Sequence, residues 1–304
     1  MCYIVTSITT FSEAPMEEHM PTLDAPGATL HYRTAGDGAP LVLVHGSCTD
    51  MTTWDGVVGE LAQEHRVIVY DRRGYGQSRH EPVRDHRVHA RDLTLLLQEV
   101  AAGPATVVGW SSGGNVALAA AVQNPELFSA LGVVEAPFHG LRHADRAVLA
   151  TALRLKLTQW RGRPIEAAEA FLRFGSALRS GGNVYDMLDD DARKGLLANS
   201  APVLAEWDPY YFGVMAEHVP LRAVVDLPVP LTWILGAESA PWIGGLHARV
   251  ARRRPDMRTV VIPGASHLVH LDRPAEFVAA VRDIAGNQHV PPKFRLIEGR
   301  RDNG

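Results

Sequence analysis

Hydrophobic positions along the chain follow two kinds of pattern, and the first kind predicts strands. Short, nearly continuous apolar runs are typical of strands that are buried on both faces of a parallel sheet. Six such runs occur, at residues 41–44, 66–70, 105–109, 131–134, 231–235 and 259–262. Residues 29–34 instead alternate apolar with polar side chains, which predicts a further, half-buried strand.

The second kind of pattern is a set of apolar side chains at helical spacing. Between residues 88 and 102, for example, Leu93, Leu96 and Leu97 share one face of a predicted helix. Comparable segments occupy residues 113–123, 246–253 and 275–285. Strands that alternate with helices predict an α/β fold, a mostly parallel, doubly wound sheet with helices on both faces.

Residues 137–228 interrupt this alternation. The segment is rich in Arg, Ala and Leu at helical spacing and has no pattern of a buried strand. Because it lies between two predicted strands of the sheet, we expect a helical cap, or lid, over the strand ends. The core then comprises 25–136 and 229–285. We expect a weakly ordered extension at 1–24 and a tail off the core at 286–304.

Composition narrows the choice of partners and location. The formal net charge is −4 and no long block of like charges occurs, so we expect no nucleic-acid partner. The chain has no apolar run of about eighteen residues and no secretory signal pattern at its start, so we expect no membrane association. Two cysteines, Cys2 and Cys48, fit a reducing, cytoplasmic location. The oligomeric state, a homo-oligomer included, stays open.

The strongest chemical motif is Gly109-Trp110-Ser111-Ser112-Gly113, between a predicted strand and a predicted helix. A strand that turns this tightly into a helix holds its serine in strained torsions and leaves room only for small neighbours, which explains the two glycines. The first amides of the helix then favour an anion beside the serine. We therefore interpret Ser111 as a catalytic nucleophile.

A second loop supplies candidates for stabilising the anion. Acyl transfer needs two backbone amides directed at the oxyanion. One candidate is the amide of Ser112, directly after the nucleophile. The other is the amide of Ser47, in the His45-Gly46-Ser47 turn that closes the strand at 41–44.

These motifs, with two more, resemble the α/β-hydrolase family over roughly residues 28–285. The stretch from Asp71 to Ser78 is similar to the family's Asp-x-x-Gly-x-Gly-x-Ser loop, and Gly264-Ala265-Ser266-His267 is similar to its late Gly-x-x-His. The resemblance implies a structural role for the Asp71 loop. It also implies a triad in the chain order serine, acid, histidine.

His267 is the candidate general base of this triad. It follows the last predicted strand on a glycine-containing loop, shortly before the final helix, where an imidazole can reach Ser111. His270 is the alternative, although its apolar neighbours indicate packing. His45 is expected to hold the geometry of its loop.

The triad acid departs from the common family pattern. Family members usually place an aspartate after the strand at 231–235, but here Ser239 occupies that position. A hydroxyl cannot stabilise an imidazolium as a carboxylate does. The candidates are Glu135, at the end of the strand at 131–134, and Glu238, one residue out of register. We favour Glu135 because its strand should lie beside the nucleophile strand.

This combination resembles a narrower subset of the family. Zearalenone-lactonase-like enzymes and some uncharacterised α/β hydrolases also combine a Gly-x-Ser-Ser-Gly turn, a glutamate after the same strand and Gly-x-x-Ser at the usual acid position. The resemblance implies hydrolysis of a carboxylic ester or lactone through an acyl-enzyme, without cofactor or metal. Carbon–carbon bond hydrolases and cofactor-free haloperoxidase-like enzymes use the same constellation, and a non-catalytic ligand-binding protein is a further alternative.

Aromatic residues supply the candidate walls of a substrate pocket. They are Trp110 beside the nucleophile, Trp207 and Tyr210 in the expected cap, and Trp242 after the strand at 231–235. Their character favours an apolar or cyclic small molecule as substrate.

Overall fold

The computed structural model describes residues 20–137, 146–206 and 219–286. Most of the expected extension, and the expected tail beyond Gly286, lie outside these residues. An eight-stranded sheet in the order β1-β2-β4-β3-β5-β6-β7-β8 forms the centre. Its strands are β1 (Thr22–Ala25), β2 (Ala28–Ala35), β3 (Ala39–Val44), β4 (His65–Tyr70), β5 (Ala105–Trp110), β6 (Phe128–Val134), β7 (Leu231–Gly236) and β8 (Arg258–Ile262).

The six strands β3 to β8 run parallel to one another. Strand β2 pairs antiparallel with β4, and β1 pairs antiparallel with β2. Alternate residues of each central strand point to opposite faces. In β3, for example, Val42 and Val44 belong to one hydrophobic cluster and Leu41 and Leu43 to the other. Both faces are therefore buried, as the continuous apolar runs predicted.

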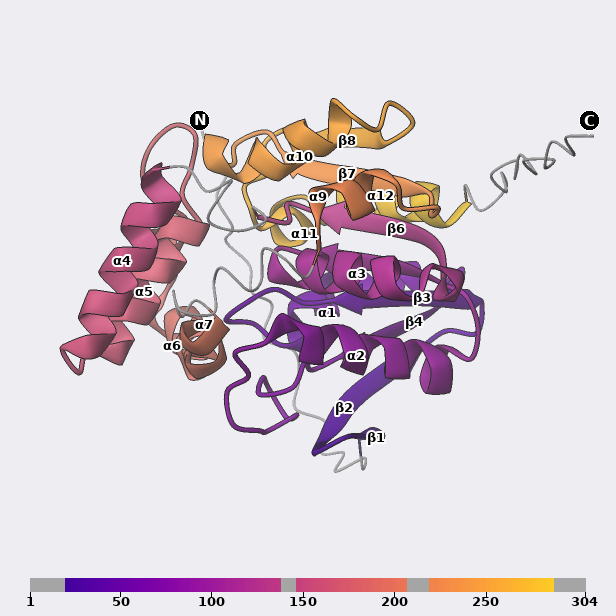
Figure 1. The fold of residues 1–304 in the computed structure, drawn as a ribbon, viewed down its shortest axis with the longest axis horizontal. Helices are drawn as coiled ribbons and strands as arrows, with labels where there is room; N and C mark the ends of the chain where they lie inside the picture. Colours follow the sequence, from indigo (N-terminus) through magenta and orange to yellow (C-terminus); the bar gives the residue numbers. More distant parts are fainter. Residues whose placement is uncertain (1–19, 138–145, 207–218, 287–304) are drawn as a thin grey trace, which may run out of the picture.

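Helices cover both faces of the sheet (Figure 1). One face carries α2 (His86–Leu96), α3 (Ser112–Gln123), α9 (Leu221–Val225) and α10 (Gly244–Ala251), and the other carries α1 (Asp55–Leu61), α11 (Val269–Asp272) and α12 (Pro274–Gly286). The core also contains four short helical segments: η1 (Met51–Trp54), η2 (Leu97–Ala101), η3 (Pro125–Leu127) and η6 (Pro241–Ile243). The predicted doubly wound α/β fold is confirmed.

A separate group of helices lies beyond one end of the sheet, on the left in Figure 1. It comprises α4 (Arg146–Trp160), α5 (Pro164–Gly175), η5 (Tyr185–Met187), α6 (Asp190–Ala198) and α7 (Ser200–Glu206). Val148, Ala152 and Leu155 of α4 pack inward, in a cluster that also contains Cys48 of the core. We refer to this group as the cap.

Hydrogen bonds attach the cap to loops of the core. After α5, Leu178 pairs with Ser239 in an isolated bridge, and the amide of Arg179 donates to the carbonyl of Glu238 at 2.8 Å. Between α6 and α7, the side chain of Asn199 accepts from the Gly76 amide and donates to Asp50, both at 3.0 Å. The cap therefore rests on loops at both sides of the strand ends.

Two segment boundaries differ from the sequence-based expectation. Residues 22–24, assigned to the extension, belong to β1, which forms a hairpin with β2 across Pro26 and Gly27. At the other boundary, α9 lies within the expected cap at 137–228, but Val224 and its neighbours Val219 and Leu227 are part of the core cluster. The described chain has therefore returned to the core by residue 219.

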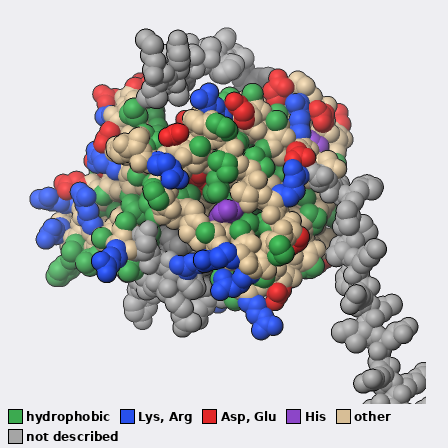
Figure 2. Space-filling model, turned by 90° about the horizontal axis from the view of Figure 1, so that it is seen from above, with side chains coloured by type: hydrophobic (Ala, Val, Ile, Leu, Met, Phe, Trp, Pro, Cys, Tyr) green, Lys and Arg blue, Asp and Glu red, His purple; other side chains and the backbone are tan. Residues whose placement is uncertain are grey.

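The outward face of α4 carries apolar side chains. Leu149, Leu153, Leu157 and Trp160 are all exposed, and they recur at helical spacing along one side of the helix. Figure 2 shows hydrophobic and basic side chains together at the cap end of the molecule.

Candidate active site

Ser111 lies at the turn between β5 and α3, in torsions that few non-glycine residues adopt. Its φ is 54° and its ψ is −124°, which is costly for a residue with a Cβ. The neighbouring glycines allow this turn. A Cβ on Gly113 would lie 2.3 Å from the carbonyl oxygen of Val44, and one on Gly109 would lie 2.5 Å from that of Gly113. Both glycines are therefore needed because the backbone at the end of β3 and the first turn of α3 pass too close to this turn to leave room for a side chain.

His267 lies in the loop between β8 and α11, and its Nε2 is 3.0 Å from the Oγ of Ser111. The indole N–H of Trp110 donates to the carbonyl oxygen of His267 at 2.7 Å. Trp110 was expected only as a pocket wall, but this hydrogen bond also ties the histidine loop to the strand that carries the nucleophile.

Glu135 follows β6 and is fully buried. Its Oε2 lies 2.7 Å from the Nδ1 of His267 and accepts from the Ser239 hydroxyl at 2.9 Å, while its Oε1 accepts from the Gly236 amide at 2.6 Å. Three donors therefore surround one carboxylate, which suits an ionised group without solvent.

The register of the sheet explains how Glu135 reaches the histidine. β6 lies between β5 and β7, and the pairing continues past the strand ends: the Ser111 amide donates to Val134 at 2.8 Å, and the Glu135 amide donates to Ile234 at 3.1 Å. Glu135 itself has a φ of 48°. Ser111 and Glu135 thus leave neighbouring parallel strands at the same edge, each with a positive φ.

The other candidate acid does not join this group. Glu238 is exposed, and its backbone is held by Arg179 and Ala265. Ser239, at the usual acid position, instead donates its hydroxyl to Glu135. Sequence reasoning missed this role, although a hydroxyl at the usual acid position together with a glutamate after the neighbouring strand was the available signal.

The two candidate oxyanion residues lie beside the nucleophile. Ser112 is the first residue of α3, where amides have no partner within the helix and the helix dipole is positive. The hydroxyl oxygens of Ser47 and Ser112 lie 2.9 Å apart, within hydrogen-bond distance. A Cβ on Gly46 would lie 2.8 Å from the Trp110 ring and 3.2 Å from the Ser111 Cβ, so the loop backbone passes directly against the nucleophile.

The remaining histidines near the site are held by other partners. His45 bonds the carbonyl of Gly46 through Nδ1 at 2.8 Å and accepts from the Arg72 amide at Nε2 at 2.9 Å. Burial lowers its pKa well below the ordinary value, so it is neutral and joins two loops. His270 bonds the Thr53 hydroxyl at 2.9 Å, and burial lowers its pKa to about 3.

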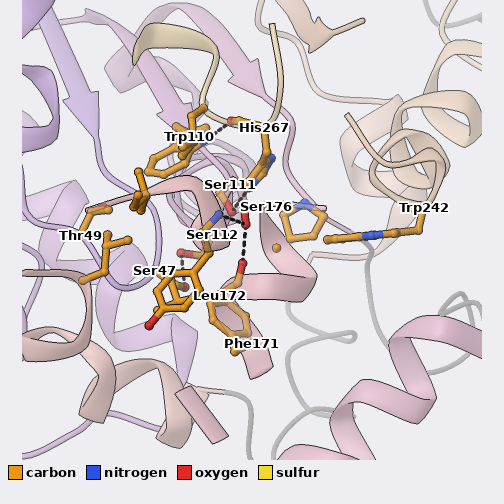
Figure 3. Close-up of a pocket in the computed structure, with 16 residues that line it drawn as sticks. Ser47, Thr49, Trp110, Ser111, Ser112, Phe171, Leu172, Ser176, Trp242 and His267 are labelled. Carbon is orange, nitrogen blue, oxygen red and sulfur yellow. Dashed lines mark hydrogen bonds between the residues drawn. The ribbon is translucent and has the colours of Figure 1, made fainter. Parts of the chain in front are cut away.

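A cavity of about 80 Å³ opens above Ser111 (Figure 3). Ser47, Thr49 and Ser112 are among the polar residues that line it, and apolar residues of the cap and the loops form most of its walls. These apolar residues include Trp110, Pro137, Phe171, Leu172, Leu188, Leu196, Trp242 and Leu268.

The four predicted pocket residues have different outcomes. Trp110 and Trp242 line the cavity, and Trp242 stacks on Phe174 with ring centroids 4.3 Å apart. Trp207 and Tyr210 lie outside the described residues.

Across the described residues, no cluster of three or more His, Cys, Asp or Glu side chains suits a metal ion. A helix long and apolar enough to cross a membrane is likewise not found in the described part of the chain.

Comparison with known proteins places the chain in a family. Residues 41–281 match the alpha/beta hydrolase family. A pimeloyl-[acyl-carrier protein] methyl ester esterase of Edwardsiella ictaluri is 29% identical over 276 residues, which are 86% of this chain and 100% of that protein. An sn-1-specific diacylglycerol lipase of Danio rerio is 27% identical over 262 residues, 81% of this chain and 78% of the lipase.

The solved structures agree with this assignment. A thermophilic esterase from Thermogutta terrifontis superposes with a TM-score of 0.69 at 25% identity, covering 89% of this chain and 98% of that one. The chain belongs to the alpha/beta hydrolase family. It is a hydrolase, with esterases and a lipase among its relatives.

Proposed function

We propose that the protein cleaves carboxylic esters, lactones included, with Ser111 as nucleophile, His267 as general base and Glu135 as the triad acid. One observation carries the proposal. An unbroken hydrogen-bonded chain runs from the Ser111 Oγ to His267 Nε2 at 3.0 Å, and from His267 Nδ1 to the Glu135 Oε2 at 2.7 Å. This is the arrangement that activates a serine hydroxyl.

Each proton and bond has an assigned place in this reaction. Glu135 accepts a hydrogen bond from the Nδ1–H of His267, which keeps that proton on Nδ1, so Nε2 is free to take the Ser111 proton while Oγ attacks the carbonyl carbon. The amides of Ser47 and Ser112 bind the oxyanion that forms. The carbon–oxygen bond to the leaving group then breaks, and His267 Nε2 returns the proton to the departing alcohol.

The second half of the reaction repeats these steps with water. His267 takes a proton from a water molecule, which attacks the acyl carbon, and the proton goes back to Ser111 as its bond to the acyl group breaks. A lactone is an internal ester, so the same steps open its ring. Glu135 and Ser239 keep the imidazole in one orientation throughout.

The character of the cavity walls favours a substrate with an uncharged, apolar group next to the scissile bond. Its walls are mainly aliphatic and aromatic, and such walls bind apolar groups while a few polar atoms fix the orientation. The ester-cleaving relatives support the choice of bond.

The proposal is tested by replacing the nucleophile. We expect the wild type to hydrolyse short aryl esters or lactones, and the Ser111→Ala variant to lose turnover by about 10⁶-fold, as in other triads. A fluorophosphonate probe should label the wild type at Ser111 only. Turnover of vinylogous diketones but of no ester or lactone would make the protein a carbon–carbon bond hydrolase. Absence of labelling would contradict an enzymatic role of the serine.

A further inference from the structure

A buried ion pair contacts two serines, Ser47 and Ser112, that line the cavity. Arg72 follows β4 and Glu206 ends α7 of the cap, and their side chains are 0% and 1% exposed. The Arg72 Nη1 lies 3.3 Å from the Glu206 Oε1. The pair thus joins a cap helix to a core loop away from solvent.

Both members of the pair contact the candidate oxyanion residues. The Arg72 Nη2 donates to the Gly46 carbonyl and to the Ser112 hydroxyl, both at 3.1 Å. The Glu206 Oε2 accepts from the Ser47 hydroxyl at 3.2 Å. One ion pair therefore contacts both segments that carry the two candidate amides.

Because both side chains are buried, each charge is stabilised mainly by the other. A buried guanidinium without a carboxylate is strongly unfavourable, so Arg72 holds this position only when Glu206 lies beside it. Because Glu206 belongs to the cap, its seating on the core and the placement of Arg72 occur together.

We propose that Glu206 is a positioning residue for the oxyanion hole, acting through Arg72 and Ser47. With the cap seated, the pair sets the Ser47 and Ser112 amides at the spacing that the oxyanion needs. With the cap lifted, the hole is incomplete. The inference rests on the proposed function, because the hole matters only when Ser111 attacks a carbonyl carbon and an oxyanion forms.

A second buried ion pair in the same loop serves as a matched control. Arg73 follows Arg72 directly, and its Nη2 lies 2.7 Å from the Asp92 Oδ1, with both side chains nearly buried. Its further hydrogen bond goes to the Pro26 carbonyl at 2.9 Å. Loss of either carboxylate leaves a buried arginine unpaired, but only Arg72 contacts the oxyanion residues.

The first experiment compares Glu206→Gln with Asp92→Asn, at a temperature where circular dichroism shows both variants folded. We expect Glu206→Gln to lower kcat by about 10²-fold, the effect of one lost oxyanion donor, with little change in KM. The Asp92→Asn variant should lose thermal stability but keep kcat. An equal fall in both variants would mean that the pair only supports the fold, and would overturn the inference.

The second experiment separates positioning from stability. Replacement of both partners by apolar residues, Arg72→Met with Glu206→Leu, removes the unpaired charge, so stability should recover. We expect kcat to stay low, because Ser47 and Ser112 have lost their contacts. Recovery of kcat together with stability would overturn the inference.

The rate of fluorophosphonate labelling of Ser111 gives a readout that does not depend on the choice of ester, because the phosphoryl oxygen occupies the oxyanion position. Slower labelling of Glu206→Gln than of wild type supports the inference. Equal rates overturn the inference alone. No labelling of the wild type overturns the proposed function, and the inference with it.

Discussion

At the scale of single residues, the proposed triad takes its acid from a different strand than is usual in the family. In this proposal the carboxylate is that of Glu135 after β6, and Ser239 at the usual position donates a hydrogen bond to it. A carboxylate on either side of the imidazole can bond Nδ1, since β6 and β7 are neighbours and end at the same edge. What the histidine requires is a buried negative charge in line with its ring, and two strands can supply it.

This arrangement predicts very different effects for two glutamates. Glu135→Gln keeps the size of the side chain but removes the charge and offers a donor in place of an acceptor, so we expect kcat to fall by about 10⁴-fold. Glu238→Gln should change kcat less than about twofold, because an exposed side chain outside the triad is within the range of ordinary surface substitutions. Steady-state kinetics on one aryl ester checks both. A larger loss in Glu238→Gln would disprove the assignment.

Predictability of the site from sequence depended on how local each interaction is. Ser111 and His267 stand in short motifs whose neighbours determine their torsions, so the sequence alone singles them out as candidates. The contacts of Ser239, Arg72 and Glu206 were not predicted because their partners are distant in the chain: Ser239 and Glu135 are 104 residues apart, and Arg72 and Glu206 are 134 apart. Only the folded sheet and the seated cap bring them together.

At the scale of elements, continuous apolar runs were the most reliable signal, since a strand buried on both faces has no polar side. The strand β1 was missed because it is a short edge strand with few buried side chains, although Pro26-Gly27 between two alternating segments indicates a hairpin. The cap boundary was misjudged because the five residues of α9 have the same helical spacing as cap helices. Only its packing shows whether such a helix belongs to the core or to the cap.

The orientation of α4 predicts unequal effects for two leucines close together in sequence. Leu153 is 60% exposed and Leu155 is fully buried. We expect Leu155→Ala to lower the free energy of unfolding by about 2–5 kcal/mol, and Leu153→Gln to change it by less than about 0.5 kcal/mol. Urea denaturation of both variants measures this. Equal losses would show that the outward face of α4 is covered in solution.

At the scale of the whole molecule, two buried histidines make the fold sensitive to acid. His45 and His270 stay neutral inside the protein, because burial lowers the pKa of His45 well below its ordinary value and that of His270 to about 3. The unfolded chain binds protons at these histidines below about pH 6.5. The folded state does not, so its stability is full above that pH and falls as the pH drops toward 3.

The contribution of His270 can be isolated by substitution. Between about pH 6 and pH 4, the free energy of unfolding of the wild type should fall more steeply than that of His270→Gln, by about 1.4 kcal/mol per pH unit. Glutamine retains a partner for Thr53, so the fold is kept. Parallel urea titrations at several pH values give the two slopes. Identical slopes would mean that His270 takes up its proton in the folded state as well.

The positive φ angles of Ser111 and Glu135 set the activity of this protein against its stability. The two residues that carry the proposed chemistry are also ones whose backbones are strained, on neighbouring strands, and such strain costs on the order of 1–3 kcal/mol per residue. A glycine at position 111 would relieve part of it while removing the nucleophile. Variants chosen for heat resistance alone will therefore tend to lose the reaction, since the surrounding sheet is what keeps these residues in place.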